Sequence, residues 1–114
     1  MTEGRLADYI AHMLTATNDA CRFVEGMSKE DFLADKRTQQ AVVMSLVIIG
    51  EAAARIMDQY SEFIAAYPAI PCRGMRGMRN RIAHGYFDLN LEVVWETVRS
   101  ALPDFSRRLQ GLRG

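Results

Sequence analysis

Cysteine and histidine are scarce in this chain, which limits the metal chemistry it can carry. Among its 114 residues there are two cysteines, Cys21 and Cys72, and two histidines, His12 and His84. The cysteines do not have the Cys-x-x-Cys spacing of a zinc site, and no histidine lies near either of them in the sequence. We therefore expect no metal site and no disulfide framework, and we interpret both cysteines as buried thiols in a reducing compartment.

The chain also lacks a long apolar run and an export signal. Its longest uncharged stretch, residues 38–50, is well short of the roughly 20 residues that a membrane-spanning helix requires. Near the N-terminus, Glu3, Arg5 and Asp8 interrupt any apolar run of the kind found in secretory signals. We expect a cytoplasmic protein that does not associate with a membrane, with residues 38–50 buried as part of a helix.

Neither sign of charge is in excess, because 14 Lys and Arg residues balance 14 Asp and Glu residues. The whole chain therefore does not have the basic character of many nucleic-acid-binding proteins. The charges are nevertheless unevenly distributed, and no acidic residue lies between Glu62 and Asp88. That window contains the basic cluster, which consists of Arg73, Arg76, Arg79, Arg81 and His84. Positive charge is thus concentrated locally.

The apolar pattern predicts an all-α single domain spanning residues 1–114. Apolar residues recur at helical spacing over about residues 3–25 and 36–60, and again in a last helix that contains Pro103. A helix starting near Cys72 and ending near Gly85 holds the basic cluster, and we expect Pro103 to kink or divide the last helix. The expected architecture is a four- to five-helix bundle. Side chains suited to cap its helices are Ser28 together with Asp31, Asp35, Ser61 (for a short helix through Tyr67) and Asn90.

The second long helix is apolar on every side, since residues 42–49 read Val-Val-Met-Ser-Leu-Val-Ile-Ile. Such a helix must be covered all round, and in a small chain part of the cover can come from a second subunit. We therefore expect a homodimer. The alternative, a buried strand, has no partner strand elsewhere in the sequence.

Glycines interrupt the basic cluster in the repeat Arg73-Gly74-Met75-Arg76-Gly77-Met78-Arg79. Each glycine costs about 1 kcal/mol relative to alanine inside a helix, so its presence requires a reason. One reason is tight packing between helices, and another is room for a phosphate group or a partner helix. We interpret the methionines of this repeat, together with Phe87 and Trp95, as core residues rather than surfaces on which bases stack.

Residues 79–86 place a cation, an amide, an imidazole and a phenol at the end of one helix, in Arg79, Asn80, His84 and Tyr86. Metal-free cleavage of RNA requires groups that take up and release a proton and a cation that stabilises charge on the phosphate oxygens. The five-residue step from Arg79 to His84 rotates the side chain by about 140° around the helix axis. For the two groups to act together, the Arg79 side chain must curl back toward His84, or two copies must meet across a dimer axis. The alternative is a surface histidine beside solvated arginines. For Glu51, a structural ion pair with Arg55 is favoured over catalysis.

Residues 77–86, Gly-Met-Arg-Asn-Arg-Ile-Ala-His-Gly-Tyr, followed by Asp88, Leu91, Val94 and Trp95, resemble the HepT-like branch of the HEPN superfamily. The hallmark of that branch is an Arg followed after four to six residues by a His, extended here to Arg-x4-His-x-Tyr. Residues 49–53, Ile-Gly-Glu-Ala-Ala, are similar to its Gly-Glu-Ala stretch on the long central helix. One departure is Cys72, which stands where the family often has Trp after a proline, and it affects packing more than activity.

The resemblance implies an HEPN-type bundle in a two-fold homodimer that acts as a metal-independent RNA endonuclease with both motifs in one cleft. Arg79 would stabilise the transition state, His84 would be the general acid or base, and Asn80 would help orient the site or the RNA. Glu51 would organise the site by pairing with Arg79 or Arg81. We expect the remaining arginines of the basic cluster to contact the RNA: Arg73, Arg76 and Arg81.

The same resemblance implies a toxin paired with an MNT nucleotidyltransferase antitoxin. The antitoxin would use ATP to transfer AMP onto Tyr86, giving O-AMP-tyrosine, and the toxin itself would need no cofactor. Two alternatives remain open at this stage. The chain could be an inactive HEPN dimer that binds a nucleotide or the partner transferase, or a plain structural dimer that binds no RNA.

Overall fold

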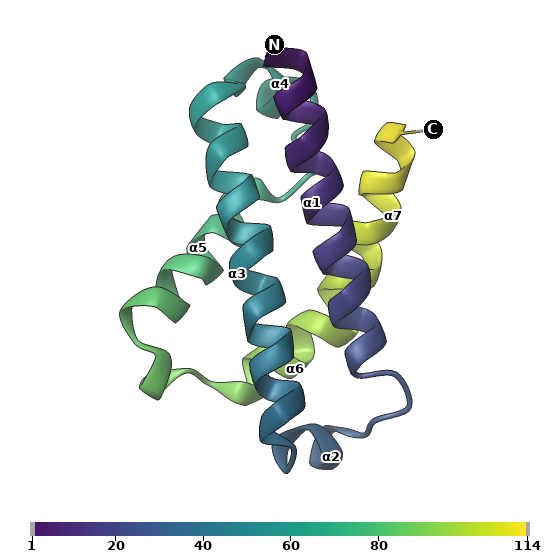
Figure 1. The fold of residues 1–114 in the computed structure, drawn as a ribbon, viewed down its shortest axis with the longest axis vertical. Helices are drawn as coiled ribbons and strands as arrows, with labels where there is room; N and C mark the ends of the chain where they lie inside the picture. The colour runs from purple at the N-terminus through teal and green to yellow at the C-terminus, as the bar shows by residue number, and fades with distance from the viewer. Residues whose placement is uncertain (1, 114) are drawn as a thin grey trace.

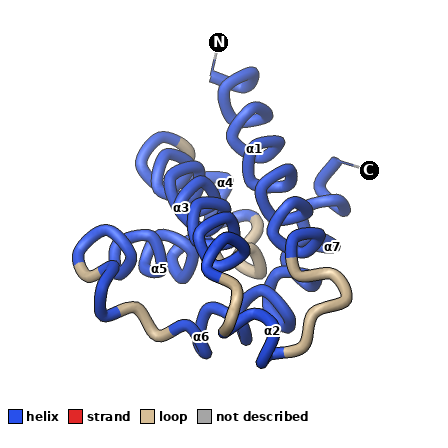
Figure 2. Tube along the Cα trace, turned by 60° about the horizontal axis from the view of Figure 1, so that its bottom comes forward, coloured by secondary structure: helices blue, strands red, loops and turns tan. Residues whose placement is uncertain are grey.

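Helices account for nearly all of the protein, and residues 2–113, which the computed structural model describes, contain no strand (Figure 2). The all-α prediction is therefore confirmed. In chain order the elements are α1 (Thr2–Phe23), α2 (Lys29–Leu33), α3 (Lys36–Gln59), α4 (Ser61–Ala66), α5 (Cys72–His84), a 3-10 turn η1 (Tyr86–Asp88), α6 (Leu91–Glu96), a π-helical turn η2 (Thr97–Ala101) and α7 (Leu102–Arg113).

Helix α3 is the centre of the bundle and packs against α1 on one side and α5 on the other (Figure 1). Helix α7 packs along α1, while the short helices α2 and α6 contact each other near the start of α3. Helix α5 therefore lies at the edge of the bundle with one long side uncovered by its own chain. This arrangement exposes Arg73, Arg81 and His84 of the basic cluster to the solvent.

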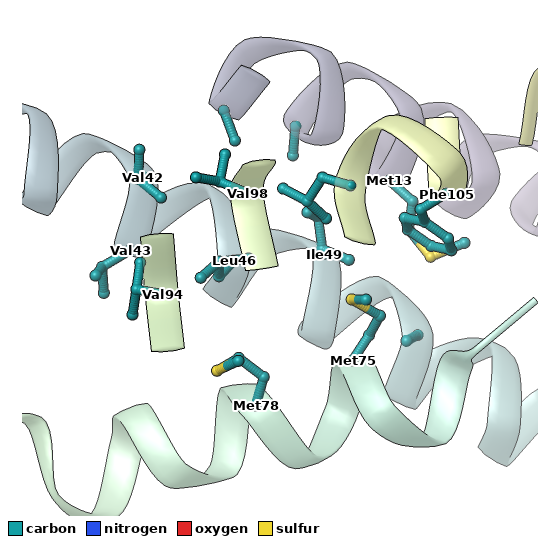
Figure 3. Close-up of a cluster of buried hydrophobic side chains, with 14 of the residues drawn as sticks. Met13, Val42, Val43, Leu46, Ile49, Met75, Met78, Val94, Val98 and Phe105 are labelled. Carbon is teal, nitrogen blue, oxygen red and sulfur yellow. The ribbon is translucent and has the colours of Figure 1, made fainter. Parts of the chain in front are cut away.

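The core forms where apolar side chains of α3 meet those of its neighbours. Figure 3 shows Met75 and Met78 rising from α5 toward Leu46 and Ile49 of α3. All four are buried, and burial of each such side chain contributes roughly 1.5–3 kcal/mol. The prediction that the two methionines are core residues is confirmed, as it is for Trp95.

The outer face of α3 remains uncovered. Met44 is 58% exposed and Ile48 is 42% exposed, one turn apart on the same helix. A helix that is apolar on all sides needs more cover than one small chain provides. The structure shows where that cover is missing.

By length and composition alone, α3 is long and apolar enough to cross a membrane. Its 24 residues exceed the uncharged stretch 38–50 because Glu51 and Arg55 continue the helix. Half of its most apolar window is buried inside the bundle. Its apolar character thus follows from its central position in the core.

Most of the predicted caps are present. The Ser28 and Asp31 capping box begins α2, Asp35 accepts the backbone N–H of Thr38, and Asn90 accepts N–H groups at the start of α6. The prediction for Ser61 was wrong, because α4 has Tyr60 as its N-cap and no capping side chain. The Tyr60 carbonyl accepts the N–H groups of residues 63 and 64, so α4 starts directly where α3 ends and Ser61 is already helical.

The last helix is divided into α6 and α7 by a π-helical turn that ends two residues before Pro103, so the expected division is present although the backbone stays helical throughout. Proline has no backbone N–H to donate to the carbonyl four residues earlier. The π-helical turn Thr97–Ala101 lies immediately before this position and joins α6 to α7 without a break in the rod. Buried Leu102, Phe105 and Leu109 then continue the apolar stripe of α7.

The two cysteines are free. Cys72 is buried, and burial raises the pKa of its thiol to about 11. Cys21 is only half-buried, and its pKa is also raised by burial. The buried-thiol prediction is therefore confirmed for Cys72, which fills the core position at the start of α5.

Candidate functional site

The position of α5 is set by a glycine on α3. A Cβ atom added to Gly50 would lie 2.3 Å from Cβ of Arg79 and 2.8 Å from the carbonyl oxygen of Met75. Only glycine fits at this crossing, because any side chain would push α5 away from α3. The Gly-Glu-Ala stretch therefore marks the contact at which Arg79 enters the site.

Arg79 is held by two neighbours. Its Nη1 donates to Oε1 of Glu51, while Nε and Nη2 donate to Oδ1 of Asn80 at 3.0 and 2.6 Å. The Arg79 side chain is only 24% exposed. Charge-assisted hydrogen bonds of this kind fix the plane of a guanidinium group. The partner of Glu51 in the described chain is Arg79, and neither Arg81 nor Arg55 forms an ion pair with it.

His84 lies apart from this anchored arginine. It is the last residue of α5 and its side chain is exposed. The N–H of Gly85 still donates to the carbonyl of Arg81, but the helix ends there because Gly85 itself leaves the helical conformation, with φ −154° and ψ 55°. Within residues 2–113, no hydrogen bond joins Arg79 to His84. Within one chain the Arg79 side chain therefore does not curl back to meet His84. It turns toward α3 instead.

His84 shares the outward face of α5 with Arg73, Gly77 and Asn80, which recur at three- and four-residue spacing. A Cβ atom added to Gly77, or to Gly74 beside this face, would meet nothing within 4 Å. Tight packing inside the chain is therefore not the reason for these glycines. They leave open space in the middle of the face that carries His84.

The cations expected to contact RNA lie on α5 as predicted. Arg73 and Arg81 are exposed and Arg76 is half-buried. In the described part of the chain, none of the three is paired with a carboxylate. Their charge is therefore available to an anionic ligand. Along the sequence, no carboxylate occurs from residue 63 to residue 87.

A hollow of about 490 Å³ opens beside His84. Arg81, Asp88 and Asn90 line it together with apolar side chains that include Leu89. The hollow provides a cation, a carboxylate and an amide within one small space next to the imidazole. No group of three metal-ligating side chains occurs among residues 2–113.

Tyr86 and Phe87 lie in the 3-10 turn that follows α5. Tyr86 is 44% exposed, and its ring meets that of Phe87 edge-on at a centroid distance of 5.9 Å. Phe87 is 99% exposed, so the prediction that it is a core residue was wrong. The turn η1 carries it past the end of the bundle, and only its position directly after the Arg-x4-His-x-Tyr motif could have indicated this.

Comparison with known proteins now identifies the family. Residues 13–112 match the sequence profile described as "Ribonuclease HepT-like". The chain is 36% identical to the probable ribonuclease HepT of Thermococcus cleftensis, with 93% of this chain and 94% of the relative covered. It is 33% identical to a proposed RNase of Methanocaldococcus jannaschii, with 90% of this chain and 82% of the relative covered.

A proposed RNase of Caldanaerobacter subterraneus subsp. tengcongensis is 31% identical over 90% of this chain and 88% of the relative. No solved structure matches the chain. The family match covers the central helix, the anchored arginine and the exposed histidine, which together agree with the resemblance drawn from the motif. The chain therefore belongs to the HepT-like family of ribonucleases.

Proposed function

We propose that this protein is a metal-independent RNA endonuclease whose active site is shared by two subunits. The observation that carries the proposal is the separation of Arg79, anchored on α3, from His84, exposed on the outward face of α5. The two groups are about 140° apart around one helix. A second copy facing the open glycines would bring the arginine of one chain to the histidine of the other.

The proposed chemistry uses the RNA 2′-hydroxyl as the nucleophile. Its oxygen attacks the adjacent phosphorus, the bond to the 5′-oxygen breaks, and the products carry a 2′,3′-cyclic phosphate and a 5′-hydroxyl. His84 takes up the proton of the 2′-hydroxyl, and a protonated His84, either the same imidazole or that of the second copy, delivers a proton to the departing 5′-oxygen. Arg79 stabilises the negative charge that builds on the phosphate oxygens. Asn80 and Glu51 act as positioning residues by holding the plane of Arg79, and Arg73, Arg76 and Arg81 contact the RNA backbone.

The expected homodimer is part of this proposal. The uncovered apolar face of α3 at Met44 and Ile48 and the open space at Gly74 and Gly77 on the neighbouring α5 support it. An Ile48→Asp substitution should convert the dimer to a monomer with an unchanged helical spectrum, because Ile48 is exposed in the single chain. Light scattering after size-exclusion chromatography measures this. A wild-type monomer at the concentration of the activity assay would contradict a shared site.

We further propose that the protein is a cytoplasmic toxin controlled by an MNT nucleotidyltransferase antitoxin. In this scheme the partner transfers AMP from ATP onto Tyr86, whose exposed phenol lies two residues from His84. The added nucleotide would place negative charge beside the basic cluster and repel RNA. Co-expression with the partner should add the mass of one AMP to the wild type and none to Tyr86→Phe. A wild-type protein that stays unmodified in the presence of an active partner would contradict modification of Tyr86.

The decisive experiment is incubation of the purified protein with total RNA in excess EDTA, followed by analysis of product ends. The wild type should produce 2′,3′-cyclic phosphate ends, and His84→Ala should produce none. His12→Ala, which removes the other histidine of the chain, is the matched control and should cleave normally. No cleavage by a folded, unmodified dimer would instead favour a nucleotide-binding or partner-binding module without nuclease activity.

A further inference from the structure

Phe87 stands out because nothing in its own chain covers it. Its side chain is 99% exposed, whereas the other phenylalanines range from fully buried to 44% exposed at Phe23. A large apolar side chain held fully in water is unfavourable for the isolated protein and often marks a binding site. Phe87 is also close to the proposed chemistry, since it follows His84 by three residues.

The surroundings of Phe87 form a second hollow, of about 560 Å³. It lies between the start of α3 and the turn η1, and Tyr86, Phe87, Lys36, Gln39 and Gln40 line it together with apolar residues. Leu89 lines both this hollow and the one beside His84, so the two are neighbours with a common wall. A ligand that reaches the imidazole can therefore extend to Phe87.

The polar groups of this second hollow suit a nucleotide. The Gln39 amide nitrogen donates to the carbonyls of Phe32 and Leu33 at 2.9 and 3.0 Å, which fixes the amide and leaves its oxygen as an acceptor. Gln40 is exposed and makes no side-chain hydrogen bond within the described residues. No carboxylate lines the hollow, and Lys36 adds a positive charge.

We propose that one unpaired nucleotide next to the cleaved bond lies in this second hollow with its base stacked on Phe87. This inference rests on the proposed ribonuclease function and assigns the substrate class as single-stranded RNA. A base stacks on an exposed aromatic ring, amides hydrogen-bond its edge, and a lysine contacts its phosphate. The mixed polar lining, the positive charge and the shared wall with the His84 hollow favour a nucleotide over an apolar protein partner.

The test pairs changes in the ring with changes in the base. The protein variants are Phe87→Ala, Phe87→Leu and Phe87→Trp, with Phe23→Ala as the control for an exposed phenylalanine that lines neither hollow. The RNA is a short single strand with one cleavable bond, in which each nucleotide flanking that bond is made abasic in turn. Cleavage gives kcat/KM, and a copy with a 2′-deoxy nucleotide at the cleaved position gives binding without cleavage.

We expect Phe87→Ala and Phe87→Leu to lower kcat/KM by roughly five- to hundredfold, the range for one base–aromatic stack. Phe87→Trp should keep more of the wild-type kcat/KM than either of these, because an indole ring also stacks on a base, and Phe23→Ala should cleave like the wild type. One abasic position should cause the same loss in the wild type and no further loss in Phe87→Ala, because the two changes remove one interaction. All variants should keep the wild-type helical spectrum, since Phe87 is not part of the core.

Three results would overturn the inference while leaving the ribonuclease proposal intact. The first is equal cleavage by Phe87→Ala and the wild type. The second is that the losses in kcat/KM from the Phe87→Ala change and from the abasic position multiply independently. The third is dissociation of the dimer in Phe87→Ala, which would make Phe87 a protein contact. If the wild type itself does not cleave, the ribonuclease proposal fails, and binding of the 2′-deoxy strand decides the inference. Equal affinity of wild type and Phe87→Ala for that strand would overturn it.

Discussion

At the scale of single residues, the arrangement around Arg79 determines what the arginine can still do. A guanidinium group has five N–H donors. Three hydrogen bonds, from Nε, Nη1 and Nη2, go to Asn80 and Glu51. Five minus three leaves two donors for a phosphate oxygen, and their direction is fixed because the other three are held. Orientation of the arginine is therefore set before the RNA arrives.

Glu51→Ala should slow catalysis more than it weakens folding. We expect kcat to fall by about tenfold with KM nearly unchanged, because Arg79 loses its orientation while the cations of the basic cluster still bind RNA. Stability should change by no more than about 1 kcal/mol, since the ion pair is partly exposed. Steady-state kinetics and urea unfolding measure both, and Glu51→Gln, which keeps an acceptor, should recover part of the rate. Equal rates for Glu51→Ala and the wild type would contradict a positioning role.

The two kinds of glycine should respond in opposite ways to alanine. Gly50→Ala should lower the free energy of unfolding by about 1–3 kcal/mol, because the added methyl group collides with Arg79 Cβ and the Met75 carbonyl. Gly74→Ala is the matched control and should raise it by up to about 1 kcal/mol, because space is open and alanine favours helix. Chemical unfolding of both variants measures the difference. A Gly50→Ala protein as stable as the wild type would show that α5 can move away freely.

At the scale of helices, the start of α3 depends on Asp35. The Thr38 hydroxyl and backbone N–H both donate to its carboxylate, at 2.8 and 3.2 Å. These hydrogen bonds hold the pKa of Asp35 below its ordinary value of 3.8, with the Thr38 hydroxyl as the largest cause. Because the pKa is lower in the folded state, the stabilisation is present above the unfolded-state value. It is lost as the pH falls through the folded-state value.

Asp35→Asn should therefore flatten the acid side of the stability curve. Asparagine can still cap the helix but does not titrate in this range. Urea unfolding between about pH 5 and pH 2 should show a smaller loss of stability for the variant than for the wild type. Asp104, whose pKa is lowered by Arg108, stays in both proteins and contributes equally. Identical slopes for the two proteins would mean that the cap does not titrate with a shifted pKa.

The helices themselves were largely predictable from the sequence, whereas the contacts between them were not. Apolar spacing and capping residues such as Asp35 and Asn90 act locally, so the sequence predicts where helices begin. Ser61 does not cap α4, because the end of α3 already supplies the carbonyl that starts this helix. The ion pair between Glu51 and Arg79 was expected only from the family resemblance, because it depends on how closely α3 and α5 cross, which local spacing does not encode. Phe87 was misassigned because an apolar residue usually predicts burial.

At the scale of the whole molecule, a shared site predicts that two inactive variants can restore each other. In a mixed dimer of Arg79→Ala and His84→Ala chains, one site receives the arginine of one chain and the histidine of the other. Random pairing makes half of the dimers mixed, and each mixed dimer has one intact site of two. Co-expressed variants should therefore recover about a quarter of the wild-type activity.

Differently tagged chains purified as mixed dimers provide the measurement, and these should have about half of the wild-type activity because every dimer then has one intact site of two. The two variant homodimers purified alone should each lack activity, which is the control for contamination by wild type. If mixed dimers are as inactive as the homodimers, Arg79 and His84 must act within one chain. The exposed histidine would then have to move toward α3 during catalysis.

The π-helical turn Thr97–Ala101 has a consequence for the way this chain can change length. It contains one residue more than a regular α-helical turn, and the wider turn absorbs that extra residue inside a continuous helical run. Deleting one residue of the π-helical turn should restore a regular α-helix and leave the following side chains in register. Deleting one residue of α6 instead would rotate every following side chain by about 100°, and Leu102, Phe105 and Leu109 would then leave the core. Viable variants of this bundle should therefore change length at the π-helical turn or around Pro68, and not within α6.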